Sequence, residues 1–374
     1  NIPTRTSKNL PSMPIPKQIA ALLSGELGAV SVSRSGPATQ ALLAQSSLQS
    51  GRSVMVVLPE QKAFDSFVHL LTLLGENVDG FPDSRWTALP GFLPGRMDTE
   101  GWSRRMSGLF SLVSGRGPRG IVATVDNLLP LLPPRHVVEQ ELLFLGRGES
   151  IDPHTILEQA VAWGYERVNL VTRVGELSLR GDVLDLFCPG YGRPLRLEFF
   201  GDTLESLRTF EPLTQRSTRE LEEAVVLPVL PSVHSEDRLE AAGKVWEHLW
   251  VTGELSKTGR NLLQREAAEE KKPVWPGLFY PDPTTLDQWV APDAVCLLVG
   301  ADLLRSRLED AAEAWRHFAS EKEARGYALP EKGLVQSVAS ARATWVERPQ
   351  ILFEDLASVP RAKTLALPEK QYGS

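Results

Sequence analysis

The sequence predicts an α/β protein in which a doubly wound sheet is interrupted by a smaller α+β domain with an antiparallel sheet. In the first part of the chain, continuous apolar strands alternate with helices of about 10–15 residues, a pattern typical of parallel sheets. Residues 174–219 instead form a run of short alternating strands separated by turn residues. A buried strand and a long helix after residue 293 can complete the first sheet.

Length and composition bound the domain organisation. The 374 residues suggest two or three domains, expected at 1–133, 134–230 and 231–374, with the third completing the first. The hydrophobic content of 42% and charged content of 23% are typical of a soluble globular protein. The net charge of −7 argues against the whole chain being a DNA-binding surface. The missing initiator Met suggests that Asn1 is not the natural start.

No cofactor, metal or membrane is expected. The two cysteines, Cys188 and Cys296, lie far apart, and with six scattered histidines they make no zinc-binding spacing. The chain shows no signal peptide or long apolar run, which together with the few cysteines predicts a cytoplasmic protein. Nothing in it indicates a small-molecule substrate.

The first domain is expected to alternate helix and strand. The predicted helices cover 16–24, 37–49, 62–74 and 102–113, and the predicted strands cover 29–33, 53–58 and 120–125. Pro37 opens the second helix at its first position, where its missing N–H costs nothing.

A sheet of this type invites a search for a nucleotide site at the strand that ends near Ser33. A P-loop needs Gly-x-x-x-x-Gly-Lys-Ser/Thr, and in that register the chain offers only Gly36, with Pro37 for the lysine and Ala38 for the hydroxyl. Pro37 also removes an N–H from the helix end that would bind phosphate. Asp126, after the strand at 120–125, is interpreted as a helix cap rather than a Walker B carboxylate. The prediction is a degenerate nucleotide site and no ATPase.

A modest basic cluster consists of Arg96, Arg104 and Arg105. It lies in and just after a short segment, residues 86–102, that is rich in proline and glycine and offers little for stacking on bases. We interpret the cluster as a solvated helix face rather than as a phosphate contact.

The second domain begins near Pro133-Pro134, with a strand expected at 137–145. Asp152 should cap a helix whose first residue is Pro153, and Gly164 should end it. Residues 151–220 contain arginine but no lysine. That composition fits bidentate pairing with carboxylates of a protein partner.

The strand at 195–200 alternates, with Leu195, Leu197 and Phe199 on one side and Arg196, Glu198 and Phe200 on the other. A one-sided antiparallel sheet then leaves Phe200 beside Arg196 on a polar face, and Arg180 joins them if its strand is phased outward. Exposed aromatics beside arginines are typical of a protein-binding hot spot. The alternative is that Phe200 folds under the turn at Gly201-Asp202 while the arginines pair with Glu198, Glu205 or Asp202.

The last part of the chain predicts helices at 235–250 and 255–272, a strand at 294–300 and a last strand at 350–353. The aromatic residues of its proline-rich tract, which we expect to lie on a core, are Trp275, Phe279 and Tyr280. A long helix is predicted to present one apolar face, made of Leu303, Leu304, Leu308, Ala311, Ala312, Trp315 and Phe318.

A family resemblance is carried by several rare words: Gly175-Glu176-x-Ser178-x-Arg180-Gly181-x-x-Leu184-Asp185-Leu186-Phe187, Pro194-Leu-Arg-Leu-Glu-Phe-Phe-Gly-Asp202, Ser206-Leu-Arg-Thr-Phe210 and Thr214-Gln-Arg-Ser217. They resemble the excinuclease-B-homology module of bacterial transcription–repair coupling factors (Mfd). The resemblance is dense over residues 161–228, patchier over 54–132 and weak beyond 232.

The resemblance implies a degenerate RecA-like fold, of the P-loop NTPase type but without a functional P-loop. It also implies a non-catalytic recruitment platform that binds the excinuclease subunit UvrA through Arg180, Arg196 and Phe200. In that family a separate ATP-driven motor acts on stalled RNA polymerase and DNA, and the docking face is expected to be masked until the motor engages. The alternatives are an excinuclease-B-like ATP-dependent helicase and a DNA-binding module.

Overall fold

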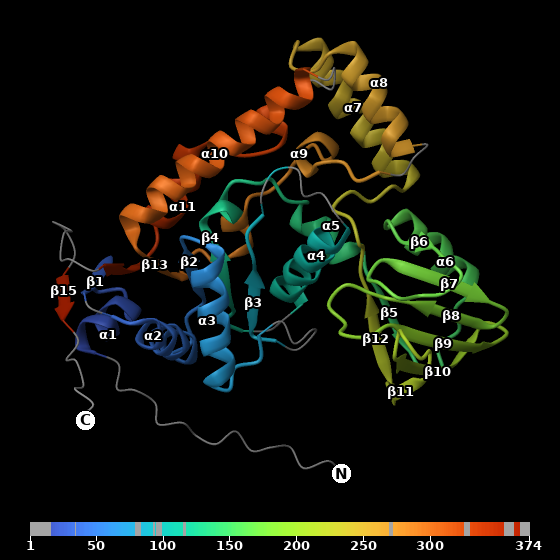
Figure 1. Cartoon of the computed structure of the whole chain (residues 1–374), viewed down its shortest axis with the longest axis horizontal. Helices are drawn as coiled ribbons and strands as arrows, with labels where there is room; N and C mark the ends of the chain where they lie inside the picture. Colours follow the sequence, from blue (N-terminus) through green and yellow to red (C-terminus); the bar gives the residue numbers. More distant parts are fainter. Residues whose placement is uncertain are drawn as a thin grey trace.

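The computed structural model describes residues 16–33, 35–78, 84–92, 94, 99–114, 117–268, 272–324, 330–354 and 363–366. Within them the chain is a mixed α/β protein with one parallel sheet, one mainly antiparallel sheet and one antiparallel strand pair (Figure 1). Among these residues, no helix combines the length and the apolar character needed to cross a bilayer.

The parallel sheet has seven strands from both ends of the chain. Their order is β15 (Lys363–Ala366), β1 (Ala29–Ser33), β14 (Gln350–Glu354), β13 (Val295–Val299), β2 (Val54–Leu58), β4 (Gly120–Thr124) and β3 (Trp86–Leu89). β13 pairs with β2, and β14 pairs with β1, all in parallel. Segments about 240–320 residues apart in the sequence therefore lie side by side, which requires the long crossovers of a parallel sheet.

Both faces of this sheet are buried, which explains the continuous apolar run of β2. Val54 and Val56 face a core formed with the helices α1 (Lys17–Leu23), α2 (Pro37–Gln49) and α3 (Gln61–Leu73). Met55 and Val57 face the other core, which includes residues of α4 (Thr99–Ser114) and α10 (Ala301–Ala324). The alternation follows from the two-residue period of a strand.

The second sheet contains six strands in the order β11 (Ser217–Glu220), β10 (Thr203–Phe210), β9 (Leu195–Phe200), β8 (Val183–Leu186), β7 (Glu176–Arg180) and β6 (Glu166–Arg167). All neighbours are antiparallel except β6 and β7. The predicted alternation of β9 is confirmed, since Leu195, Leu197 and Phe199 are buried.

Helix α6 (Pro153–Ala162) belongs to the core beneath this sheet. The Asp152 side chain caps it by accepting a hydrogen bond from the His154 N–H at 2.8 Å, as predicted. Gly164 follows with a φ of +93°, a conformation that favours glycine and ends the helix. Helix α6 therefore covers the inner face of this sheet.

One predicted strand is wrong. Residues 135–140 form helix α5 (Arg135–Gln140), and only then does β5 (Leu143–Gly146) begin and pair with β12 (Glu223–Val226). The β-branched pair Val137 and Val138 suggested a strand, but both side chains are buried on the helix face that packs near α4. Burial in the tertiary structure outweighs their local propensity.

The remaining helices are α7 (Glu236–Val251), α8 (Lys257–Ala268), α9 (Pro276–Phe279), α11 (Val338–Val346) and the short 3-10 helices η1 (Val125–Leu128), η2 (Leu286–Trp289) and η3 (Glu331–Gly333). Trp275, Phe279 and Tyr280 lie in the core, as predicted. The predicted apolar face of α10 is confirmed at Leu304, Leu308 and Trp315, whereas Leu303 is exposed.

Candidate protein-binding site

The outer face of the six-stranded sheet carries the three residues predicted from the sequence. Arg180 in β7 pairs with Val183 in β8, and Val183 pairs with Glu198 in β9. Directly paired residues point to the same face of an antiparallel sheet, and so do residues two apart along a strand. Arg180, Arg196 and Phe200 therefore share one face, which settles the phasing that the sequence left open.

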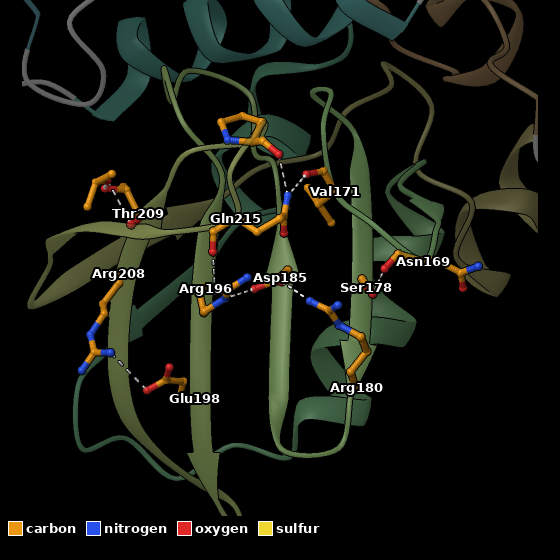
Figure 2. A network of polar contacts seen from close by, with 12 residues as sticks. Asn169, Val171, Ser178, Arg180, Asp185, Arg196, Glu198, Arg208, Thr209 and Gln215 are labelled. Atoms are coloured by element: carbon orange, nitrogen blue, oxygen red, sulfur yellow. Dashed lines mark hydrogen bonds and ion pairs between the residues drawn. The ribbon is translucent and has the colours of Figure 1, made fainter.

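A single carboxylate joins the two arginines. Asp185 in β8 lies between them, and its side chain is only 1% exposed (Figure 2). Its Oδ1 accepts a hydrogen bond from Arg196 Nε at 2.7 Å. Its Oδ2 accepts from Arg196 Nη2 at 2.9 Å and from Arg180 Nη2 at 2.8 Å. Both arginines thus bind Asp185, rather than the acids considered from the sequence, Glu198, Glu205 and Asp202.

Sequence reasoning missed Asp185 as a member of the site. It stands in the apolar run Leu184-Asp185-Leu186, which looks like a core strand with one stray acid. The register of the strands determines its neighbours: Asp185 pairs with Ser178 on one side and with Arg196 on the other. A lone acid in a short apolar strand was the available signal, since such a charge needs a partner when it is buried.

Arg196 is largely enclosed, with its side chain 16% exposed. Its guanidinium group lies 4.5 Å from the centre of the Phe210 ring, and its Nη1 donates to the Gln215 carbonyl oxygen at 3.1 Å. The hydrogen bonds to Asp185 raise the pKa of Arg196, so it stays charged under all ordinary conditions. Figure 2 shows Arg196 between Gln215 and Asp185.

Gln215 supports this arrangement from a tight turn. Its backbone has a φ of +58°, rare for a residue other than glycine. Its Nε2 donates to the carbonyl oxygens of Val171 at 3.2 Å and Pro212 at 2.7 Å. These bonds hold the turn so that the Gln215 carbonyl oxygen faces Arg196.

Phe200 is the exposed aromatic of the face. It is 77% exposed and ends β9, directly before the turn at Gly201, whose φ is +58°. The alternative that Phe200 folds under the turn is therefore wrong. Elsewhere the same face is covered, because Val171, Phe187 and Phe210 form a small buried cluster on it.

The loop before β7 is anchored by Glu176. Its Oε2 accepts hydrogen bonds from the N–H groups of Thr172 and Arg173 at 2.7 and 2.9 Å and from the Thr172 hydroxyl at 3.0 Å. Burial pushes the pKa of Glu176 up, but these hydrogen bonds, with one from the Arg173 guanidinium, outweigh it and the pKa is lowered from 4.5. The next motif residue, Ser178, donates to the Asn169 carbonyl oxygen at 3.4 Å.

The start of α2, where a nucleotide site would lie, offers fewer N–H groups than a phosphate-binding helix end. Gly36 is the N-cap and Pro37 the first helical residue. The Gly36 carbonyl oxygen accepts from the N–H groups of Thr39 and Gln40 at 3.0 and 3.2 Å. The Gln40 side chain donates to the Ser35 carbonyl oxygen at 3.1 Å. Few N–H groups thus stay available for a phosphate at this helix end.

Asp126 is not a helix cap, contrary to the prediction. It lies inside η1, whose N-cap is Thr124, and its Oδ2 accepts a hydrogen bond from the Phe92 N–H at 2.8 Å. Asp126 therefore fixes the segment after β3 to the end of β4. A lone acid after a strand does not reveal from sequence which N–H it will meet.

The arginines of the basic cluster differ in burial. Arg105 is buried, with its guanidinium group 4.0 Å from the centre of the Phe92 ring and Nη2 donating to Asn127 Oδ1. Burial lowers the pKa of Arg105 to about 10, although the nearby Asp126 charge opposes the shift. Its interpretation as a solvated residue is therefore wrong. Arg104 pairs with Glu100 at 3.3 Å, and Arg96 lies outside the described residues.

The part of the chain that contains the outer face is similar to a known protein family. Residues 143–230 match the UvrB interaction domain family. This region is therefore similar to UvrB interaction domains. It contains Asp185 and all three predicted residues of the site.

The chain also has relatives among known proteins. It is 35% identical to a transcription-repair-coupling factor of Myxococcus xanthus over 39% of the chain and 12% of that protein. It is 30% identical to one of Mycobacterium bovis over 75% of the chain and 24% of that protein. It is 32% identical to one of Haemophilus influenzae over 51% of the chain and 17% of that protein. The chain is thus related to transcription-repair-coupling factors, and it spans about a quarter or less of the length of these curated relatives.

Proposed function

We propose that the chain is the UvrB-like, N-terminal module of a transcription-repair coupling factor and that it recruits UvrA without catalysing a reaction. The observation that carries the proposal is the outer face of the UvrB interaction domain, where the exposed Phe200 lies on the same face as Arg180 and Arg196. An exposed aromatic ring on the same face as arginines is the composition of binding hot spots. The family resemblance assigns UvrA binding to these three positions.

We further propose that the parallel sheet is a degenerate RecA-like fold, split by the inserted domain into residues 1–133 and 231–374, with 134–230 as the docking domain. The strand order supports this, because strands from both parts pair with one another in one sheet. In such sheets ligands bind beyond the carboxyl ends of the strands. Here that edge has Gly36, Pro37 and Ala38 in place of a phosphate-binding loop.

The two alternatives have less support. An ATP-dependent helicase needs a lysine and a hydroxyl at Pro37 and Ala38, and neither residue can supply the chemistry. A DNA-binding module would use exposed arginines, but Arg105 is buried and Arg104 is paired with Glu100. In the complete protein, RNA polymerase and DNA would be bound by other domains, in the bacterial cytoplasm where repair takes place.

The test is calorimetric titration of the chain into purified UvrA, with Phe200→Ala and Arg180→Ala as variants. We expect each substitution to weaken binding about 30-fold, because each removes a hot-spot contact. Leu213→Ala is the matched control for Phe200, since Leu213 is also an exposed apolar residue of the same domain but has no predicted role. It should change the affinity less than about twofold.

Two results would contradict the proposal in different ways. Absence of binding by the folded wild-type chain would end the recruitment function for this segment. Binding that is insensitive to Phe200 and Arg180 would keep the function but move the site elsewhere.

A further inference from the structure

The two arginines of the outer face are not equivalent. Arg196 uses all three of its nitrogens within the chain, with Nε and Nη2 on Asp185 and Nη1 on the Gln215 carbonyl oxygen. Together with its low exposure and the Phe210 ring against it, this leaves Arg196 little to offer another protein.

Arg180 has the opposite environment. Its side chain is 51% exposed, and within the described part of the chain its one side-chain hydrogen bond runs from Nη2 to Asp185 Oδ2. The guanidinium group has five N–H donors, so most of them point to solvent and can meet a carboxylate. Figure 2 shows Arg180 reaching Asp185 from the neighbouring strand β7, on the side opposite to Arg196.

The charges divide in the same way. Asp185 forms a bidentate pair with Arg196, which is the strongest arrangement of a guanidinium group and a carboxylate. One carboxylate cannot balance two guanidinium groups, so the cluster keeps one positive charge. Among the described residues, Glu198 makes no ion pair with Arg180; it pairs with Arg208 at 3.6 Å, as Glu220 does at 3.5 Å. The unbalanced charge lies on the exposed member, Arg180.

We propose that Arg196 is a positioning residue which occupies Asp185 and so leaves the charge of Arg180 free for a carboxylate of the partner. This inference rests on the proposed function and assigns different roles to the two arginines of its site. Asp185 orients Arg180 without contacting the partner, since the carboxylate is enclosed. The partner surface needs one Asp or Glu for Arg180 and an apolar pocket for Phe200.

The inference predicts a rescue. In Arg196→Met, which keeps an apolar side chain against Phe210, Asp185 loses its main partner and turns to Arg180, whose charge is then balanced within the chain. Affinity for UvrA should fall about 10-fold or more. In Arg196→Met with Asp185→Asn, Arg180 again carries an unbalanced charge, and affinity should recover at least about threefold relative to Arg196→Met.

Two comparisons complete the titration series. In an Arg180→Ala background, Arg196→Met should change the affinity less than about twofold, because its effect passes through Arg180. Arg219→Ala removes the same formal charge from the exposed strand β11 and should also change the affinity less than about twofold. The thermal midpoint of every variant is measured so that loss of folding is not read as loss of binding.

A direct contact between Arg196 and the partner predicts different results. The double variant would then bind no better than Arg196→Met, and Arg196→Met would weaken binding equally with and without Arg180. Either result overturns the inference. If the wild-type chain does not bind UvrA, the proposed function fails, and the positioning is tested by NMR of the free protein. The Arg180 guanidinium rotation should slow in Arg196→Met, and an unchanged rotation would refute it.

Discussion

The two large sheets of this molecule differ in how many of their faces the chain covers. The seven-stranded sheet has helices on both faces, and its strands are apolar on both sides. The six-stranded sheet is packed on its inner face, whereas part of its outer face stays open around Arg180 and Phe200. The candidate site lies where a face was left without cover. In the covered sheet, ligands would be expected at the carboxyl ends of the strands. There, helix α2 starts with Pro37, which has no N–H to donate.

Two phenylalanines at strand positions give the largest expected effect. Phe353 in β14 is 2% exposed, and Phe353→Ala should lower the free energy of unfolding by about 3–5 kcal/mol, because it leaves a cavity between close-packed layers. Phe200→Ala should change it by less than about 0.5 kcal/mol. Denaturant unfolding of both variants measures the difference. A large loss of stability in Phe200→Ala would mean that this ring is structural, and the open face would lose its aromatic anchor.

Charged residues of the outer face offer a second comparison. Asp185→Asn should destabilise the protein by about 2 kcal/mol, because two arginines lose their shared carboxylate. The loss is limited because Arg180 is half exposed and water can solvate its charge. Glu198→Gln, on the same face, should cost less than about 0.5 kcal/mol, because its pair with Arg208 is open to solvent. Chemical denaturation again provides the measurement. Equal effects of the two substitutions would show that Asp185 is not the organising charge.

Glu176 should contribute to stability in a way that depends on pH. Glu176→Gln should cost about 1–2 kcal/mol at pH 7, since the amide keeps one acceptor but meets the Arg173 guanidinium with a donor. The folded pKa lies below 4.5, so the stabilisation is complete above pH 4.5 and disappears as the pH falls through the folded pKa. The stability difference between wild type and variant should therefore shrink below pH 4.5. A difference that stays constant down to pH 3 would exclude the carboxylate as its origin.

Much of the fold was predictable because local patterns agree with the tertiary structure. The strand β9 alternates and is half buried, and the apolar β2 is buried on both sides, as their sequences predict. Helix α5 was missed because Val137 and Val138 have strand propensity but are buried by helix packing. Short segments are where tertiary contacts override local preference.

The sequence indicated a shared face for Arg196 and Phe200, but not the hydrogen-bond partners of the arginines. Alternation placed Arg196 and Phe200 together, whereas the shared partner Asp185 depends on the register of three strands. Arg105 shows the same limit, because its burial depends on Phe92 and Asn127, which come from other segments. Sequence indicates which side chains need partners, and only the assembled sheet determines which partners they meet.

The smallest expected effect concerns the covered sheet. Mg²⁺ and ATP should not raise the thermal midpoint of the chain beyond a sodium sulfate control of equal ionic strength, because Pro37 removes an N–H from the helix end and Pro37 and Ala38 replace the lysine and hydroxyl of a P-loop. A ligand present at about 100 times its Kd would stabilise the protein by about 2.7 kcal/mol, which a thermal scan detects easily. A shift of several degrees would mean that the edge of the parallel sheet still binds nucleotide. The seven-stranded sheet would then have a ligand site of its own, and its contrast with the open outer face of the six-stranded sheet would no longer hold.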